Sequence, residues 1–277
     1  MCPSRLPKAH EPEAPRGVQV SCVVRCSLPV DEPYDVAWFE QLASIEAKSF
    51  WFRARNRLIV SMLRKHFPDA EKMLELGVGT GYVLTGIHDE IPGLRLVGSD
   101  LYEEGLVFAR QRLPDVEFAR LDARALPYHD EFDVVGAFDV LEHVEDDSLI
   151  LENVWQALRP GGGTILLVPQ HPRLWSEADV MANHVRRYVR RDLVAKVRAA
   201  GFDPVRVTSF VTTLLPAMAV SRRGPYDPIR ALVPGRLNRM FEAILDAERK
   251  LIERGISLPV GGSLLVVGRK PPAEPGR

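Results

Sequence analysis

The sequence predicts an α/β fold in which an open, mainly parallel sheet is covered by helices on both faces. Short apolar segments alternate with amphipathic segments along the middle of the chain. Several apolar segments are hydrophobic at nearly every position, as is typical of parallel strands buried on both faces. A Gly-x-Gly-x-Gly turn also stands between the first apolar segment and the next helix. Alternation of this kind predicts right-handed strand–helix–strand crossovers.

The expected strands and helices largely alternate along the chain. Strands are expected at 72–76, 94–99, 116–119, 132–138, 163–169 and 205–210, and helices at about 81–90, 103–113, 147–158 and 191–200. Pro160-Gly161-Gly162-Gly163 should stop the helix at 147–158 and separate it from the fifth strand. Two helical segments precede the first strand, around Trp38–Ile45 and Leu58–Leu63. An amphipathic helix between Leu237 and Ile252 precedes a last strand at 261–270.

The length of 277 residues, 46% of them hydrophobic, suits one domain with additions rather than two full domains. We expect a disordered leader at 1–33, a single domain at 34–270 and a tail at 271–277. Within the domain we expect an N-terminal helical cover at 34–68 and a cofactor-binding core at 69–210. An acceptor-side insertion at 211–258 and the last strand at 259–270 should follow.

Composition narrows the function classes. The net charge of −1 provides no global basic field for nucleic acid or an anionic membrane. The three cysteines, Cys2, Cys22 and Cys26, lie in the first tenth of the chain without a further Cys or His cluster beside them. Their odd number favours a reducing compartment over a disulfide framework, and no metal site is expected. The first thirty residues lack the apolar core of a signal peptide.

The longest uncharged stretch is also too short to span a membrane. It runs from Val207 to Ser221, whereas a spanning helix needs about 20 apolar residues. We therefore expect a soluble cytoplasmic protein with no transmembrane segment, in which this stretch can touch a membrane surface or an apolar substrate.

The glycine turn, MLELGVGTGYV at Met73–Val83, predicts a ligand site. Glycine at Gly77, Gly79 and Gly81 lets a ligand approach bare backbone at the start of a helix. Tyr82 breaks the G-x-G-x-x-G pattern of dinucleotide sites, and no Lys-Ser/Thr follows Gly81 as in a triphosphate loop. Glu75 would repel a phosphate, so the turn favours a ligand that carries a positive charge.

Acidic residues follow the next three strands of the predicted sheet. Asp100, Asp122 and Asp139 each stand at or near the carboxyl end of a strand, where ligands of open α/β sheets bind. An acid at the end of the second strand is suited to accept hydrogen bonds from ribose hydroxyls. The alternative for any one of these acids is a helix cap or a solvated turn.

Five segments of the sequence resemble the motifs of a known protein family. ELGVGTG, GSD, LDARALP, FDVVGAFDVLEHV and LRPGGGTILLVPQ are similar to successive motifs of the class I S-adenosylmethionine-dependent methyltransferases, between about Met73 and Gly201. The flanks SFWFRARNRLI, HVRRYVRRDL and GGSLLVVGRK resemble a bacterial subgroup with varied small-molecule substrates. The resemblance implies a Rossmann-like, doubly wound sheet of seven strands with the last strand antiparallel.

The resemblance also implies roles for individual residues. Glu75, Gly77, Gly79 and Gly81 would line the amino-acid part of the cofactor. Asp100 would bind the ribose and Leu101 would pack on the adenine, while Asp122 would accept from the adenine amino group with Ala123 beside it. Phe138 and Asp139 would form the floor at the methionine end. S-adenosylmethionine is cationic at sulfur and has no phosphate, so an acid-lined pocket suits it.

Methyl transfer by in-line displacement requires the protein mainly to position the acceptor and exclude water. An acceptor that carries a proton benefits from a general base, and His143, His171 and His184 follow the fourth and fifth strands. The alternatives are a structural or cofactor-side role for His143 and a solvated basic surface around His184. Three arginines of the amino-terminal region, Arg53, Arg55 and Arg57, are either surface charges or contacts for an anionic acceptor.

The sequence thus predicts methyl transfer to a small-molecule acceptor. The apolar segment TTLLPAMAV indicates a hydrophobic acceptor. The alternative is a non-catalytic S-adenosylmethionine-binding partner subunit. Nucleic-acid or protein methylation is disfavoured, because no Asn-Pro-Pro-Tyr-type segment follows Phe138.

Overall fold

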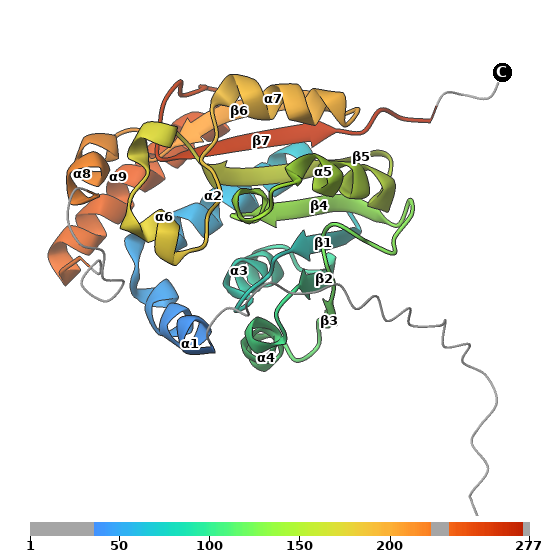
Figure 1. Cartoon of the computed structure of the whole chain (residues 1–277), viewed down its shortest axis with the longest axis horizontal. Helices are drawn as coiled ribbons and strands as arrows, with labels where there is room; N and C mark the ends of the chain where they lie inside the picture. Colours follow the sequence, from blue (N-terminus) through green and yellow to red (C-terminus); the bar gives the residue numbers. More distant parts are fainter. Residues whose placement is uncertain (1–35, 223–232, 274–277) are drawn as a thin grey trace, which may run out of the picture. The chain divides into compact units, whose positions relative to one another are not determined.

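A computed structural model describes residues 36–222 and 233–273 (Figure 1). The predicted leader with its three cysteines, and the end of the predicted tail, lie outside the described residues. Residues from Tyr34 onward form one compact unit built around a seven-stranded sheet. The strands are β1 Lys72–Leu76, β2 Arg95–Asp100, β3 Glu117–Arg120, β4 Phe132–Phe138, β5 Leu158–Pro169, β6 Asp203–Phe210 and β7 Ser263–Arg269.

Helices connect and flank these strands. The α-helices are α1 Val36–Ile45, α2 Phe50–His66, α3 Tyr82–Glu90, α4 Glu103–Arg112, α5 Asp147–Ala157, α6 Glu177–Met181, α7 Arg190–Ala199, α8 Leu215–Ser221 and α9 Gly235–Glu253. Three short 3-10 helices, η1 Glu46–Lys48, η2 Leu141–His143 and η3 Pro172–Leu174, complete the described chain. No helix within the described residues is both long enough and apolar enough to cross a membrane.

The strand order is β3-β2-β1-β4-β5-β7-β6, and β7 runs antiparallel to both of its neighbours. The predicted doubly wound sheet with an antiparallel last strand is therefore confirmed. From β1 the chain moves outward to β2 and β3, and it then returns to β4 on the other side of β1. Ligands of open α/β sheets bind at such a switch point, beside the carboxyl ends of the strands.

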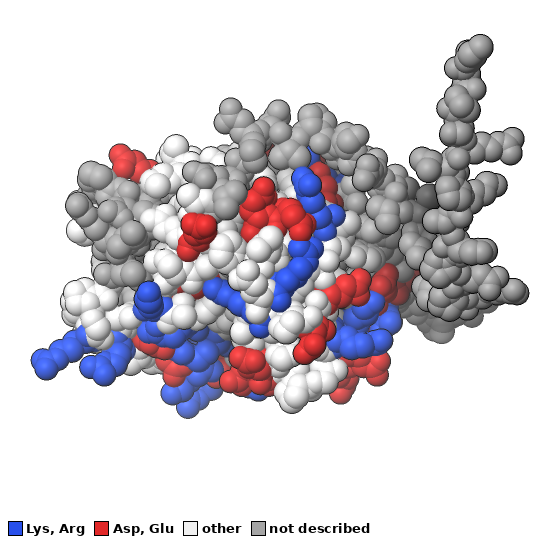
Figure 2. All heavy atoms as spheres, turned by 90° about the horizontal axis from the view of Figure 1, so that it is seen from below, with Lys and Arg blue, Asp and Glu red and all other residues white. Residues whose placement is uncertain are grey.

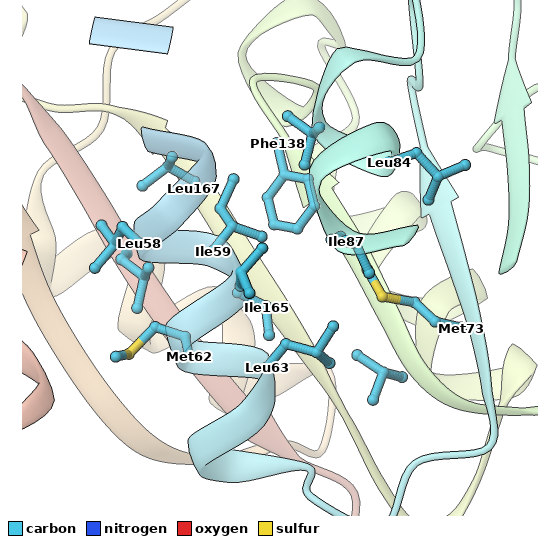
Figure 3. Close-up of a cluster of buried hydrophobic side chains, with 14 of the residues drawn as sticks. Leu58, Ile59, Met62, Leu63, Met73, Leu84, Ile87, Phe138, Ile165 and Leu167 are labelled. Carbon is cyan, nitrogen blue, oxygen red and sulfur yellow. The ribbon is translucent and has the colours of Figure 1, made fainter. Parts of the chain in front are cut away.

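Alternating side chains of the strands build two hydrophobic cores. Met73 and Val134 face the layer of α2, α3, α4 and α9, whereas Leu74 and Val135 face the layer of α5 and α7. Figure 3 shows the first core, where Leu58 and the neighbouring apolar side chains of α2 point toward the sheet. Full burial of each aliphatic side chain contributes about 1.5–3 kcal/mol to the stability of the folded state. The two helical layers therefore hold the sheet in place.

Helices from opposite ends of the chain pack side by side. Phe50 of α2 lies against Phe241 of α9 with ring centroids 5.3 Å apart, and its main-chain N–H donates to Asn238 Oδ1 at 2.8 Å. Glu242 of α9 pairs with Arg53 and Arg57 of α2. The predicted N-terminal cover is thus anchored by the helix that precedes the last strand.

The predicted boundary between the helix at 147–158 and the fifth strand is wrong. β5 begins at Leu158, which pairs with Phe132 of β4, and it runs through the Pro-Gly-Gly-Gly segment. The segment stays in the sheet because Lys270 donates its main-chain N–H to Gly162 O at 2.8 Å. Proline lacks a donor, and the register shift between Phe132 and Val134 accommodates it.

Candidate functional site

The glycine loop between β1 and α3 forms the centre of the candidate site. Gly77, Gly79 and Gly81 all take positive φ, at 63°, 52° and 79°. A Cβ at Gly77 would lie 2.4 Å from Val140, and one at Gly81 would lie 2.9 Å from Ala109, so protein atoms fill those two directions. A Cβ at Gly79 would meet no described atom within 4 Å. Gly79 is therefore where this backbone is open to a ligand.

Asp100, the last residue of β2, is held beside this loop by main-chain hydrogen bonds. Its Oδ2 accepts from the N–H of Gly79 at 2.8 Å, and its Oδ1 accepts from the N–H of Tyr102 at 2.9 Å. Burial raises the pKa of Asp100, and these main-chain donors oppose that rise. Carboxylate oxygens accept more than one hydrogen bond, so a ligand hydroxyl can still bind here. The predicted ribose contact is compatible with this placement.

Glu75 of β1 is the least satisfied acid of the site. Its side chain is buried, and its Oε2 atom has no hydrogen-bond partner among the described residues. Burial raises the pKa of Glu75 well above its ordinary value, and the positive charge of Arg55 opposes this. A buried carboxylate without a partner either keeps a proton or accepts a cation. The position therefore suits a ligand with a positive charge.

Asp139 directly follows β4 and takes an uncommon backbone conformation. Its φ of 57° is rare for a residue other than glycine, and such residues cluster at functional sites. Its Oδ2 lies 2.6 Å from Nη2 of Arg55, which comes from α2. Arg55 is buried and lies over the ring of Trp51 at 5.2 Å. The N-terminal cover thus places a cation between the carboxyl ends of β1 and β4.

The residues predicted to surround the adenine are held by their neighbours. Arg124 Nη2 lies 2.7 Å from Asp122 Oδ2, and the Arg124 N–H donates to Asp122 Oδ1 at 2.8 Å. Burial alone would raise the pKa of Asp122, but the hydrogen bonds from Arg124 lower it overall. Ala123 packs at the edge of the second core, and the Leu101 carbonyl accepts from Arg120 Nε at 3.0 Å. The adenine contacts of these residues stay predictions.

Phe138, the last residue of β4, lies next to the candidate site, and its side chain is in the hydrophobic core. Its ring belongs to the first core, between the sheet and the helices α2 and α3 (Figure 3). It therefore supports the backbone that carries Asp139. Its predicted contact with the methionine end of the cofactor stays a prediction.

The structure brings together two of the three predicted histidines. His143 in η2 and His184 beyond α6 have ring centroids 4.8 Å apart and nearly perpendicular planes. Burial, and next the neighbouring His184, lower the pKa of His143 to about 4. His171 directly follows β5 at a positive φ of 65° and is half-buried. Burial, and next the charge of Arg187, lower its pKa as well.

The basic run around His184 is largely folded into the protein. Asp179 of α6 is buried, and its carboxylate lies 2.7 Å from Arg187 Nε and 2.8 Å from Arg222 Nη1. The same carboxylate lies 3.0 Å from Nδ1 of His184. The alternative of a solvated basic surface is therefore wrong for Arg187 and His184. Sequence analysis missed Asp179, because only the fold brings it to these cations.

Comparisons with known proteins agree with this geometry. A family model described as a methyltransferase domain matches residues 74–164, which include the glycine loop and Asp139. A protein of Mycolicibacterium smegmatis that bears the name of an S-adenosylmethionine-dependent methyltransferase is 28% identical over 165 residues, which are 58% of this chain and 63% of that protein. Residues 74–164 therefore match a methyltransferase domain, and the chain is similar to S-adenosylmethionine-dependent methyltransferases.

Other proteins named as methyltransferases are similar to this chain over shorter stretches. A ubiquinone/menaquinone biosynthesis C-methyltransferase of Methylococcus capsulatus is 34% identical over 143 residues, which are 48% of this chain and 54% of that protein. The chain thus spans roughly half the length of such curated relatives. The solved structure of Haemonchus contortus phosphoethanolamine N-methyltransferase 2 with S-adenosylmethionine has a TM-score of 0.59, at 18% identity and with 86% of this chain and 58% of that chain covered. That likeness concerns the fold alone.

The methyl donor of such methyltransferases fits the residues of the site. S-adenosylmethionine carries a positive charge and no phosphate, and Glu75 offers a buried carboxylate oxygen that lacks a described partner. The open direction at Gly79 leaves room for the ligand next to Asp100. The candidate donor site therefore lies at the switch point between β1 and β4.

Proposed function

We propose that this protein transfers a methyl group from S-adenosylmethionine to a small-molecule acceptor by in-line displacement. The observation that carries the proposal is the buried Glu75 carboxylate beside the open loop at Gly79. That carboxylate would repel a phosphate, whereas a cationic nucleoside neutralises its charge. We assign residues 69–210 to donor binding, and residues 34–68 and 211–258 to the acceptor side.

When bound, S-adenosylmethionine supplies an activated methyl group, so the chain itself has to hold and orient the reactants. Glu75 supplies the counter-charge, Asp100 accepts from the ribose, and Gly79 allows close approach of the main chain. Arg55 and Asp139 tie the helix α2 to the end of β4 and keep water from the floor of the site. Positioning of this kind contributes up to about 7–11 kcal/mol in favourable cases.

The acceptor side favours a small and partly apolar molecule. Large apolar side chains are exposed on and around α6, α8 and α9, namely Trp175, Val180, Met181, Val220, Leu237 and Met240. Figure 1 shows α1, α6 and α8 gathered at the end toward which β4 and β5 point. One relative bears a name from quinone biosynthesis, which is in keeping with an apolar ring as acceptor.

The surface charge also supports a small acceptor. Figure 2 shows acidic and basic side chains lying next to one another on one face of the described residues. This pattern, with a net charge of −1, favours a small molecule over nucleic acid. We place the reaction in the cytoplasm on the basis of cysteine usage.

For an acceptor that loses a proton, we assign the general base to His171. It follows β5 at the rim of the site and is half-buried, so it stays accessible. His143, by contrast, has its pKa lowered to about 4 by burial and is a weak base at neutral pH. Nδ1 of His184 is held by Asp179, and its Nε2 faces the buried carboxylate of Glu142 at 3.9 Å.

Two measurements test the proposed function. Isothermal titration with S-adenosylmethionine and S-adenosylhomocysteine should show saturable binding with one site per chain. Transfer of a labelled methyl group should then appear with at least one acceptor from a panel of quinols, phenols, carboxylates and amines. Binding without transfer across the panel favours the alternative of a non-catalytic partner subunit. A folded protein that binds NAD or ATP but neither of the two nucleosides contradicts both functions.

A further inference from the structure

Three potential metal-binding side chains converge beside the site, although the sequence predicts no metal. Glu142 and His143 come from η2, and His184 comes from the segment after α6. One ligand atom from each of them lies within 4.8 Å of the other two. The fold thus joins two residues at the end of β4 to a histidine about forty positions later in the chain.

Glu142 is the most unusual member of this cluster. Its side chain is fully buried, and neither carboxylate oxygen has a hydrogen-bond partner among the described residues. The nearest cationic candidate, His184 Nε2, lies 3.9 Å from Oε1, beyond hydrogen-bond distance. An unpaired carboxylate in the interior is strongly destabilising, so this group requires either a proton or a cation.

His184 is oriented as a metal ligand would be. Its Nδ1 lies 3.0 Å from Asp179 Oδ1, so the neutral ring donates its N–H there and turns the Nε2 lone pair toward Glu142. A metal-binding histidine almost always donates its other ring N–H to such an acceptor. Arg187 and Arg222 hold Asp179 in its ionised form, so the acceptor is fixed before any ion arrives.

His143 adds a second ring to the cluster, at 4.8 Å from the ring of His184. Main-chain groups of Asn183, Asp139 and Ala182 lie within hydrogen-bond reach of its ring. A histidine must be neutral to bind a metal. His143 and His184 are partly buried, and the His184 side chain is 13% exposed.

We propose that Glu142, His143 and His184 bind one divalent transition-metal ion, for which Zn²⁺ is the reference. Two imidazoles and one carboxylate form a known zinc ligand set with a fourth position open for water or substrate. Tetrahedral bonds of about 2.0–2.1 Å place ligand atoms about 3.4 Å apart, so the three side chains need to close by about 1 Å.

A bound ion would also activate the acceptor of the methyl group. This role of the ion rests on the proposed function. Glu142 lies three residues beyond Asp139, so the open coordination position would be close to the acceptor side of the site. An acceptor hydroxyl bound there would lose its proton more readily, because a bound cation stabilises the oxyanion. The metal site itself does not depend on this step.

Direct metal binding by the full chain tests the proposal. Protein stripped with a chelator should bind one Zn²⁺ per chain in calorimetry, and Co²⁺ should produce a visible absorption band with the same stoichiometry. His184→Asn and Glu142→Gln should each weaken Zn²⁺ binding at least about 100-fold. Loss of the hydrogen-bond partner of a histidine ligand already weakens metal binding up to about 100-fold, and loss of a ligand should weaken it no less. His88→Asn, at an exposed position of α3, is the matched control and should bind as the original protein does.

The outcomes separate the metal site from the donor site. Circular dichroism and S-adenosylhomocysteine binding, measured without metal, show whether each variant is folded and whether the proposed function holds. A folded protein that binds the nucleoside but no Zn²⁺ or Co²⁺ overturns the metal site, and Glu142 is then a protonated acid. Equal Zn²⁺ affinity in His184→Asn and His88→Asn also overturns it, because the ion then lies elsewhere.

Discussion

At the scale of single residues, the site is dominated by carboxylates whose partners differ. Asp100 receives two main-chain N–H groups, Asp122 is paired with Arg124, and Asp139 is paired with Arg55. Glu75 alone among these four keeps a buried oxygen without a described partner. The four acids therefore respond differently to a cationic ligand, and Glu75 should respond most strongly.

Asp100→Ala should weaken S-adenosylhomocysteine binding by about 1–3 kcal/mol, because the ribose loses its acceptor and the Gly79 N–H loses its partner. Isothermal titration measures this change. Glu104→Ala, on the neighbouring turn of α4, serves as the control and should alter affinity little. Unchanged affinity in a folded Asp100→Ala protein would remove Asp100 from the donor site.

The pH dependence of stability should report on Glu75. Burial raises the pKa of Glu75 in the folded state above its value of about 4.5 in the unfolded chain. The folded state therefore holds a proton that the unfolded state releases, so this stability is present below about pH 4.5 and is lost as pH rises through the folded pKa. Urea unfolding over this range should show a shallower pH dependence in Glu75→Gln.

The release of the Glu75 proton when a ligand binds can be measured separately from the pH dependence of stability. A cationic ligand favours ionised Glu75, so binding should release a proton in the original protein and not in Glu75→Gln. Calorimetry in buffers of different ionisation enthalpy measures the proton count. An identical count in both proteins would show that Glu75 does not face the cationic group.

At the scale of elements, the N-terminal helices complete the site rather than merely covering it. Thr80 Oγ1 of the glycine loop donates to the buried Glu46 carboxylate of η1, at 2.7 and 2.8 Å to its two oxygens. Arg112 of α4 pairs with the same carboxylate at 2.8 Å. Together with the pair of Arg55 and Asp139, these contacts join η1 and α2 to the glycine loop and to the end of β4.

Arg55→Ala should therefore destabilise the fold more than Arg57→Ala does. Arg55 is buried on Asp139, which would lose its partner, so a loss of about 1–3 kcal/mol is expected. Arg57 is 40% exposed in its ion pair with Glu242, and such pairs contribute about 0–1 kcal/mol. Urea unfolding of both variants measures the difference. Equal losses would mean that Arg55 acts as an ordinary surface charge.

At the scale of the whole molecule, the donor site couples elements from most of the described chain. Glu75, Asp100 and Asp139 end or follow three strands, α2 closes over them, and α9 anchors α2 through Glu242. A ligand that bridges the strand ends should therefore stabilise the compact unit as a whole and not only the loop that touches it.

S-adenosylhomocysteine at 100 times its dissociation constant should raise the unfolding free energy by about 2.7 kcal/mol, because it binds the folded state alone. Thermal unfolding with and without the nucleoside measures the shift, and NAD at the same concentration is the control. A shift with NAD that equals the shift with the nucleoside would contradict the assignment of the donor.

Much of the fold was predictable because it depends on local patterns. Strands such as β1 and β4 are short apolar runs, and helices such as α5 show apolar residues at helical spacing, so their existence follows from neighbouring residues alone. The start of β5 was predicted wrongly because proline and three glycines normally end regular structure. Pairing with Phe132 and Lys270, both distant in sequence, outweighed that local preference.

By itself, the sequence determined the order of strands and helices, the glycine loop and the acids at the strand ends, since each depends on residues close together in the chain. Only the tertiary structure placed Arg55, of three neighbouring arginines, on Asp139. It alone gave Asp179 two arginines and His184 as partners, and it placed His184 beside Glu142 and His143. The physical reason is that burial and charge pairing between distant segments arise when helices close over the sheet, and no local pattern encodes them.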